Sequence, residues 1–247
     1  MDKDDSGAKA RVDQSAINYS QAATTTYAGS TIQSGQTEDK QSVYSYNTME
    51  AQNFVRRIGN RAYNAMSDVY FLPTDDDEWT RLNKQHIAIF VGLGALYPVP
   101  DVVRSILAPK EGEVKRILDL GCGTGLWATE MAKEFPHCEV LGVDLAPVPI
   151  DKMDVPANCR FELDDITKGL GHFKGQYDFV NARLIGAGLK NFRQTLRDAA
   201  ECLKPGGMVF WLDGDYDMYA EDQHVYMPFA TDEDASGSWF QRIVYGS

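Results

Sequence analysis

The chain has 247 residues, of which 43% are hydrophobic and 11% aromatic, which is ample for a folded core. Its formal net charge of -12 argues against direct nucleic-acid binding, which requires a basic face. No stretch approaches the roughly 18 apolar residues of a membrane span, and the N-terminus lacks the apolar segment of a secretory signal, so we expect an intracellular protein of the cytoplasm, the nucleus or both, with no membrane contact.

The N-terminal part of the chain divides into two segments. Residues 1–48 are rich in Ser, Thr, Gln, Ala, Gly and Asp and contain few branched aliphatic residues. Such a segment cannot bury enough apolar surface to offset the entropy lost on ordering, so we predict a disordered tail. Residues 49–110 are predicted to form an N-terminal helical cap, which begins with a helix over residues 49–65.

A second helix of this cap is predicted after Thr74 or Asp75, because either residue can cap the acidic first turn that follows it. Residues then recur at spacings of three and four and predict one helical face, formed by Trp79, Leu82, His86, Ile89 and Phe90. Pro98 and Pro100 are expected to end the helical part.

From Lys115 onward, short apolar segments alternate with helical ones. The strand candidates are RILDL, CEVLGVDL, CRFELDD, YDFVNARL and MVFWLDGD, and the helix candidates are LWATEMAKEF and LKNFRQTLRDAAECL. Strands separated by helices imply right-handed crossovers, so we predict an α/β fold with a mostly parallel sheet and helices on both faces. The last helix has an apolar stripe formed by Leu189, Phe192, Leu196, Ala199 and Leu203, and LKPGG is expected to end it.

The stretch ILDLGCGTGLW joins the first of these strands to a helix. Gly121, Gly123 and Gly125 remove side chains, which lets a ligand approach the backbone. A dinucleotide-binding G-x-G-x-x-G would place its third glycine at position 126, which is Leu126, so an NAD-dependent oxidoreductase is disfavoured. The carboxylate of Asp119 would repel a pyrophosphate and attract a ligand that carries an ammonium and a sulfonium. S-adenosylmethionine carries both and has no phosphate.

Acidic residues also end the next two strands. Asp144 can accept two hydrogen bonds from ribose hydroxyls, or it can cap the following turn APVP; the upstream loop favours the ribose. After the third strand, Asp164 or Asp165 can accept a hydrogen bond from an adenine amino group, and the backbone N–H of Ile166 can donate to the ring. The alternative is that the DDIT stretch only caps a helical turn, and a single residue can do both.

The fourth strand ends in Asn181, Ala182 and Arg183, at the rim where open α/β sheets bind ligands. His86, Tyr70, Arg183 and Tyr216 are further residues that could approach the site, but none of them is assigned a catalytic role. For His86, a hydrogen-bonded position in the interior is the preferred interpretation. The four cysteines and four histidines are scattered, so no metal site and no disulfide is expected.

The motifs ILDLGCGTG, LGVDL, FELDDI, YDFVNARL and LKPGG, in this order, resemble the class I S-adenosylmethionine (SAM)-dependent methyltransferases over residues 115–215. VYFLPTDDDEWTRLNKQH and NCRFELDD are similar to the fungal LaeA-like methyltransferases, whose members are tied to control of secondary metabolism and development. The resemblance implies a Rossmann-like fold and methyl transfer to an unknown acceptor, a small molecule or a protein. The acidic charge, the predicted disordered tail and the short C-terminal part leave room for an alternative, a non-catalytic SAM-binding regulator or scaffold with a protein partner.

The resemblance also implies residue roles. The methionine end of SAM would lie at Asp119 and the three loop glycines, the ribose at Asp144, and the adenine at Asp165 and Ile166. The segment from Glu78 to His86 would form a helix over the cofactor. The full set of candidate cofactor-binding residues is Asp119, Gly121, Cys122, Gly123, Gly125, Asp144, Leu145, Asp165, Ile166 and Asn181.

The resemblance further predicts that the SAM-binding domain covers residues 111–247. The family fold has seven strands, so a helix and a two-stranded hairpin are expected after MVFWLDGD. Only residues 216–247 remain for them, which is short for three elements and their connections. We therefore expect a C-terminally shortened chain whose last strands are incomplete.

Overall fold

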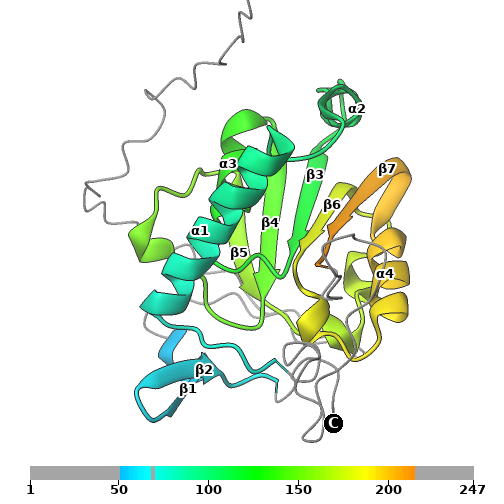
Figure 1. The fold of residues 1–247 in the computed structure, drawn as a ribbon. Coiled ribbons are helices and arrows are strands. Elements are labelled where there is room, and N and C mark those ends of the chain that lie inside the picture. The colour runs from blue at the N-terminus through cyan, green and yellow to red at the C-terminus, as the bar shows by residue number, and fades with distance from the viewer. Residues whose placement is uncertain (1–50, 68–69, 215–247) are drawn as a thin grey trace, which may run out of the picture.

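The computed structural model describes residues 51–67 and 70–214, and its centre is a five-stranded sheet in the order β5-β4-β3-β6-β7 (Figure 1). The predicted tail, Tyr216 and the expected C-terminal strands lie outside the described residues. Every neighbouring pair in this sheet is parallel. The strands are β3 (Lys115–Leu120), β4 (Cys138–Asp144), β5 (Cys159–Leu163), β6 (Tyr177–Arg183) and β7 (Leu203–Leu212).

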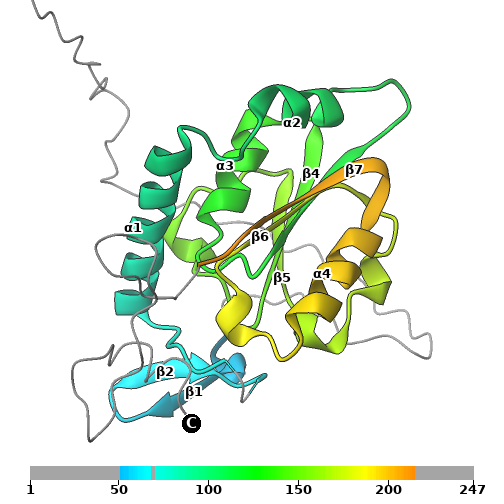
Figure 2. The same cartoon turned by 45° about the vertical axis from the view of Figure 1, so that its right-hand side comes forward.

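Helices cover both faces of the sheet (Figures 1 and 2). One layer contains α2 (Pro100–Leu107) and α3 (Leu126–Glu134), and α1 (Asp76–Leu93) packs against α3. The other layer contains α4 (Phe192–Glu201). The 3₁₀ turns are η2 (Ala51–Phe54), η3 (Ile150–Lys152), η4 (Ile166–Lys168), η5 (Gly171–Phe173) and η6 (Gly186–Gly188). The predicted α/β fold with a parallel sheet is confirmed.

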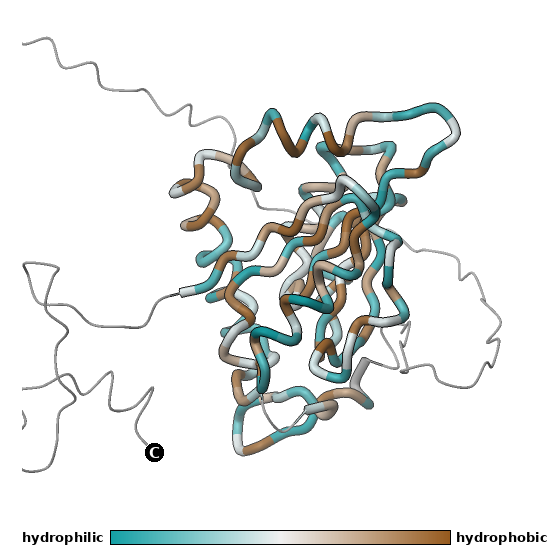
Figure 3. The backbone as a smooth tube through the Cα atoms, turned by 90° about the vertical axis from the view of Figure 1, so that its right-hand side faces the viewer, coloured by the Kyte–Doolittle hydropathy of each residue, from teal (hydrophilic) through white to brown (hydrophobic). Residues whose placement is uncertain are grey.

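Two hydrophobic clusters lie on opposite faces of the sheet, because successive strand residues point in opposite directions. Ile117 and Phe179 belong to the cluster under α2 and α3, whereas Leu118 and Val180 belong to the cluster on the α4 side. Burial on both faces explains why the strands read as continuous apolar runs, which Figure 3 shows in the central strands. Trp127 stacks on Phe179 with 6.2 Å between ring centroids and joins α3 to the sheet.

The segment before α1 differs from the prediction. Residues 55–64 form an antiparallel hairpin of β1 (Val55–Ile58) and β2 (Arg61–Asn64), so the helix expected over residues 49–65 is wrong. The two residues between the strands are Gly59 and Asn60, and Gly59 has a φ of +60°. A two-residue loop that begins with glycine favours a hairpin turn, and this local signal overrides helix propensity.

The hairpin is attached to the start of α1 through Asp75. Arg61 donates from Nε and Nη2 to the Asp75 carboxylate at 2.6 and 2.9 Å, and this pairing lowers the pKa of Asp75 to about 2. The same carboxylate accepts from the backbone N–H of Glu78 at 3.2 Å and caps the helix. The predicted helix start is therefore confirmed, with Asp75 as the capping residue.

Two further boundaries and the burial of one helix face differ from the prediction. Pro100 is the first residue of α2, where proline is well tolerated, rather than the end of a helical part. Strand β7 begins at Leu203, so LKPGG is part of a strand. In the last helix, Phe192 and Leu196 are exposed and Ala199 is fully buried, so the predicted apolar stripe is only partly buried in the described part of the chain.

Candidate functional site

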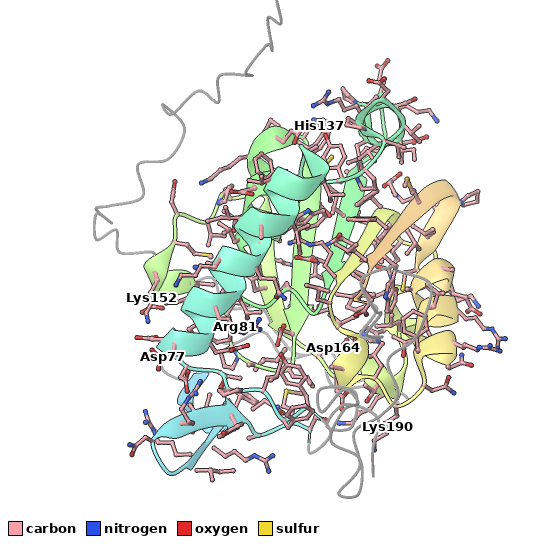
Figure 4. The ribbon with its side chains drawn as sticks, in the orientation of Figure 1. Asp77, Arg81, His137, Lys152, Asp164 and Lys190 are labelled. Atoms are coloured by element: carbon pink, nitrogen blue, oxygen red, sulfur yellow. The ribbon has the colours of Figure 1, made fainter. Side chains whose placement is uncertain are left out.

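A cavity lies between α1 and the loop that follows β3, at the carboxyl edge of the sheet. In Figure 4, Asp164 lies at this edge of the sheet, and Arg81 lies on the half of α1 that is nearer to this edge. His137 lies at the opposite edge of the sheet. The cavity is lined by Leu82, Gln85, His86, Ile89, Asp119, Gly121, Cys122, Gly123, Thr124, Leu126, Trp127, Arg183 and Leu184. Carboxyl edges of parallel strands are the usual ligand-binding position in open α/β sheets.

The loop from Gly121 to Gly125 requires glycine for two physical reasons. Gly121, Gly123 and Gly125 have φ values of +64°, +57° and +74°, a region that disfavours side chains. A Cβ atom on Gly121 would collide with Cγ2 of Ile185, and one on Gly125 would lie 2.5 Å from Cζ of Phe161. The loop is thus a narrow backbone cradle with room only for hydrogen atoms at these positions.

Asp119 supplies a carboxylate to this cavity from the end of β3. Its side chain is only 3% exposed, and Oδ1 accepts a hydrogen bond of 2.6 Å from Nδ2 of Asn181 on the adjacent strand β6. Burial raises the pKa of Asp119 to about 7, although the charge of Arg183 and the hydrogen bond from Asn181 act against this rise. A buried carboxyl poised near neutrality is a good partner for a ligand that brings a positive charge.

Asp144, at the end of β4, holds the glycine loop from the neighbouring strand. Oδ2 accepts from the backbone N–H of Gly123 at 2.8 Å, and Oδ1 accepts from that of Ala146 at 3.1 Å. The turn-capping role considered from the sequence is therefore present. Burial raises the pKa of Asp144 to about 6, against the lowering effect of these backbone hydrogen bonds. The ribose role of Asp144 stays a prediction.

The two acidic residues after β5 also have partners within the protein. Oδ1 of Asp165 accepts from the backbone N–H of Thr167 at 3.1 Å and from its hydroxyl at 2.6 Å. Oδ2 of Asp164 lies 2.9 Å from Nε2 of His172. The capping role of Asp165 is therefore present, and its predicted contact with adenine, together with that of the Ile166 N–H, stays a prediction.

Helix α1 covers the cavity and is tied to its walls by side-chain hydrogen bonds. The hydroxyl of Thr124 donates to Oδ1 of Asn83 at 2.8 Å. One turn further along α1, Nε2 of His86 lies 2.8 Å from Oε2 of Glu130, a residue of α3. On the other side of the ring, Nη2 of Arg183 lies 3.1 Å from Nδ1 of His86. The helix expected over Glu78 to His86 is therefore present and lies beside the glycine loop, while its position over the cofactor stays a prediction.

The structure brings only part of the predicted set into the cavity. Four of the ten predicted residues line it: Asp119, Gly121, Cys122 and Gly123. Asn181 lies behind Asp119 as its hydrogen-bond donor. The other five, outside the cavity lining, are Gly125, Asp144, Leu145, Asp165 and Ile166. Gly125 shapes the loop through its backbone conformation. Asp144 contacts the loop by accepting a hydrogen bond from the backbone N–H of Gly123.

Sequence reasoning missed several residues at the cavity. Trp127 and Leu126 open α3 directly after the loop, so their position after the glycines was an available signal. The sequence contained no comparable signal for Thr124 and Leu184. Tyr70, which was considered as a residue near the site, is close enough to Asp144 and Glu78 that their charges, after burial, help to raise its pKa.

Comparison with known proteins gives the family. Residues 97–243 match a family described as a methyltransferase domain, which is more than half of the chain. The chain belongs to this methyltransferase family. S-adenosylmethionine is the cofactor of the family, so the cofactor predicted from the sequence is confirmed. Within the described residues, no helix is long and apolar enough to cross a membrane.

The chain is similar to several curated fungal proteins. It is 44% identical over 151 residues to the secondary metabolism regulator LaeA of Coprinopsis cinerea, which covers 61% of this chain and 37% of that protein. It is 32% identical over 172 residues to the methyltransferase PytC of Aspergillus terreus, covering 69% of this chain and 50% of that protein. It is 29% identical over 178 residues to the protein-methionine methyltransferase LaeA of Emericella nidulans, covering 72% of this chain and 45% of that protein.

The chain therefore spans about half or less of the length of these relatives. Among solved structures, it resembles a Haloferax volcanii putative methyltransferase in complex with the Trm112 activator. That match has a TM-score of 0.39 and 19% identity, and it covers 55% of this chain and 56% of the other.

Proposed function

We propose that this chain binds SAM at the carboxyl edge of β3, β4 and β5 and transfers the methyl group to an acceptor atom that needs no deprotonation. The observation that carries this proposal is the buried carboxylate of Asp119 beside a glycine cradle under α1. The cradle admits a ligand close to the backbone, and the carboxylate selects a cation. Asp144 would bind the ribose, and Asp165 with the N–H of Ile166 would bind the adenine.

The chain itself supplies position and shielding in this reaction. SAM, held by Asp119 and the glycine loop, would supply an activated methyl group to the acceptor lone pair, and its sulfur would take the electrons of the broken S–CH₃ bond. Leu82, His86 and Ile89 of helix α1 line the cavity and limit the contact of a bound ligand with water. Asp119 and Arg183 face the same cavity and fix the orientation of a charged ligand.

The hydrogen bonds of His86 favour an acceptor that keeps no exchangeable proton on its reacting atom. Because a guanidinium only donates hydrogen bonds, Nδ1 of His86 accepts from Arg183 and Nε2 carries the proton toward Glu130. Both ring nitrogens are thus engaged, and His86 is not free to remove a proton. A thioether sulfur meets this condition, and one relative bears the name protein-methionine methyltransferase. We therefore propose a thioether, such as a methionine side chain, as the acceptor class.

Two measurements test this function. Calorimetry with S-adenosylhomocysteine tests the cofactor site, and the proposal expects binding with one molecule per chain. Tritiated SAM is then incubated with the chain and a methionine-containing peptide, using the same peptide with norleucine as the matched control. Label in the methionine peptide alone supports the proposal. Label in other acceptors of a cell extract overturns the acceptor class, and binding without any transfer favours the non-catalytic regulator.

A further inference from the structure

Arg183 lies at the end of β6 with an unusual set of contacts. Its Nη2 donates to His86, and its guanidinium carbon lies 5.6 Å from the centroid of the Trp127 ring. Its Nε atom is buried and has no hydrogen-bond partner among the residues that the structure describes. A buried donor without a partner costs about 1–3 kcal/mol, so this nitrogen is expected to have a ligand as its partner.

The register of the sheet brings Arg183 and Asp119 to the same cavity. Asp119 is paired with Asn181 across β3 and β6, and Arg183 is two residues further along β6. Side chains two residues apart on a strand share a face, so Arg183 lies on the side of the sheet where Asn181 meets Asp119. Both charged residues line the cavity, one as an anion and one as a cation.

Asp119 and Arg183 each form a hydrogen bond with an uncharged side chain, which does not neutralise the charge. Asp119 accepts from the neutral amide of Asn181, and Arg183 donates to the imidazole of His86. Buried charges of opposite sign that each hydrogen bond to a neutral group suit a zwitterionic ligand. The α-ammonium and α-carboxylate of an amino acid form such a pair on one carbon atom.

The protein also holds Arg183 in a fixed position. The ring of His86 is held by Glu130, which in turn fixes the nitrogen that accepts from Arg183. The next residue, Leu184, has a φ of +55°, and its N–H donates to the carbonyl of Leu212 at 2.7 Å. Such strained backbone is kept where the surroundings fix it, and it is frequent at ligand sites.

We propose that Arg183 binds the α-carboxylate of the methionyl part of the cofactor, in the same cavity as Asp119, to which the resemblance already assigns the methionine end. This inference rests on the proposed function, because it deepens the same cofactor site. Guanidinium groups recognise carboxylates with directed hydrogen bonds, and Nε is the donor that is still available. His86 and Glu130 are positioning residues in this arrangement, since they act on the ligand through Arg183.

The test compares two ligands that differ only in the carboxylate. Calorimetry measures the dissociation constants of SAM and of decarboxylated SAM for the wild-type chain and for Arg183→Gln. The wild-type chain is expected to bind SAM at least tenfold more tightly than the decarboxylated ligand. In Arg183→Gln this ratio is expected to fall to about one or two. Only SAM loses affinity in this variant, because the decarboxylated ligand has no carboxylate to contact Arg183.

Further variants separate binding from folding. Arg183→Lys keeps a positive charge without the Nε donor and is expected to give an intermediate ratio. Arg193→Gln, at an exposed position of α4, is the matched control and is expected to keep the wild-type ratio. In His86→Ala the ratio is expected to fall while thermal unfolding shows a folded protein. An unchanged ratio in both Arg183 variants overturns the inference and leaves the proposed function intact. If the wild-type chain binds neither ligand, both proposals fail.

Discussion

The Asn181 side chain donates a 2.6 Å hydrogen bond to the Asp119 carboxylate across β3 and β6, and Asn181 is fully buried. A neutral amide satisfies one oxygen of the carboxylate without supplying a counter-charge. The charge of Arg183 in the same cavity offsets part of the cost of burying this carboxylate, and a bound cation or a proton would offset more of it. Because burial raises the pKa of Asp119 to about 7, the proton is taken up near neutral pH.

The first prediction concerns the pH dependence of binding. A cationic ligand favours the ionised form of Asp119, so the affinity for SAM should increase as the pH rises toward 7.5. Below the pKa of about 7, each lower pH unit should weaken binding by up to about tenfold. Calorimetry at pH 5.5, 6.5 and 7.5 in buffers of different ionisation enthalpy measures the affinity and the protons released. An affinity that is constant over this range would contradict the assigned role of Asp119.

Asp119→Asn is the matched control, and it also tests stability. When folding raises the pKa of a carboxyl group, the folded state is favoured at a pH below the pKa of the unfolded chain. It is disfavoured at a pH above the pKa of the folded chain, where the buried group is ionised. The SAM-free wild-type chain should therefore lose stability between about pH 4 and pH 7 through this group. Relative to wild type, Asp119→Asn should gain roughly 2–3 kcal/mol between pH 5 and pH 8, measured by urea unfolding, while SAM binding is weakened.

The second prediction concerns the loop glycines. Gly121 and Gly112 both have positive φ, of +64° and +76°, but an added Cβ would meet Ile185 only at Gly121. Both alanine variants should lose about 1–2 kcal/mol from backbone strain, and Gly121→Ala should lose about 1–3 kcal/mol more from overpacking. Urea unfolding of the two variants measures the difference. Equal losses at both positions would show that the loop has more room than the structure indicates.

The third prediction concerns Asp144. Asp144→Ala should weaken SAM binding at least tenfold, because two hydrogen bonds to the ribose hydroxyls are lost, each worth about 1 kcal/mol or more. Asp154→Ala, at an exposed position, is the control and should bind like wild type. Since Asp144 also accepts from Gly123 and Ala146, thermal unfolding must show a folded variant. A folded Asp144→Ala protein with wild-type affinity would exclude the ribose role.

The sheet could be predicted because its strands are buried on both faces. Ile117 and Leu118 point to opposite clusters, so both must be apolar, and the same is true of Phe179 and Val180. The cradle was equally visible, because a positive φ is a local property that the glycine pattern encodes. These features depend on residues within one strand or one loop.

The hairpin and the cover of the cavity depend on longer-range information. Strands β1 and β2 have four residues each, and the hairpin is tied to α1 through Arg61 and Asp75, 14 residues apart. His86 meets Glu130 at a separation of 44 residues and Arg183 at a separation of 97 residues. No spacing pattern in the sequence encodes such pairs, because packing of α1 against α3 decides them.

The family match begins at residue 97, whereas α1 ends at Leu93 and still provides the cover of the cavity. A shorter chain that starts at residue 97 would retain all five strands of the parallel sheet and yet leave the cradle open to water on one side. A transplant of residues 76–93 from a relative would exchange that cover without altering the strand ends. The architecture thus separates the strand ends, at which we propose that the nucleoside binds, from a helix that covers one side of the cavity.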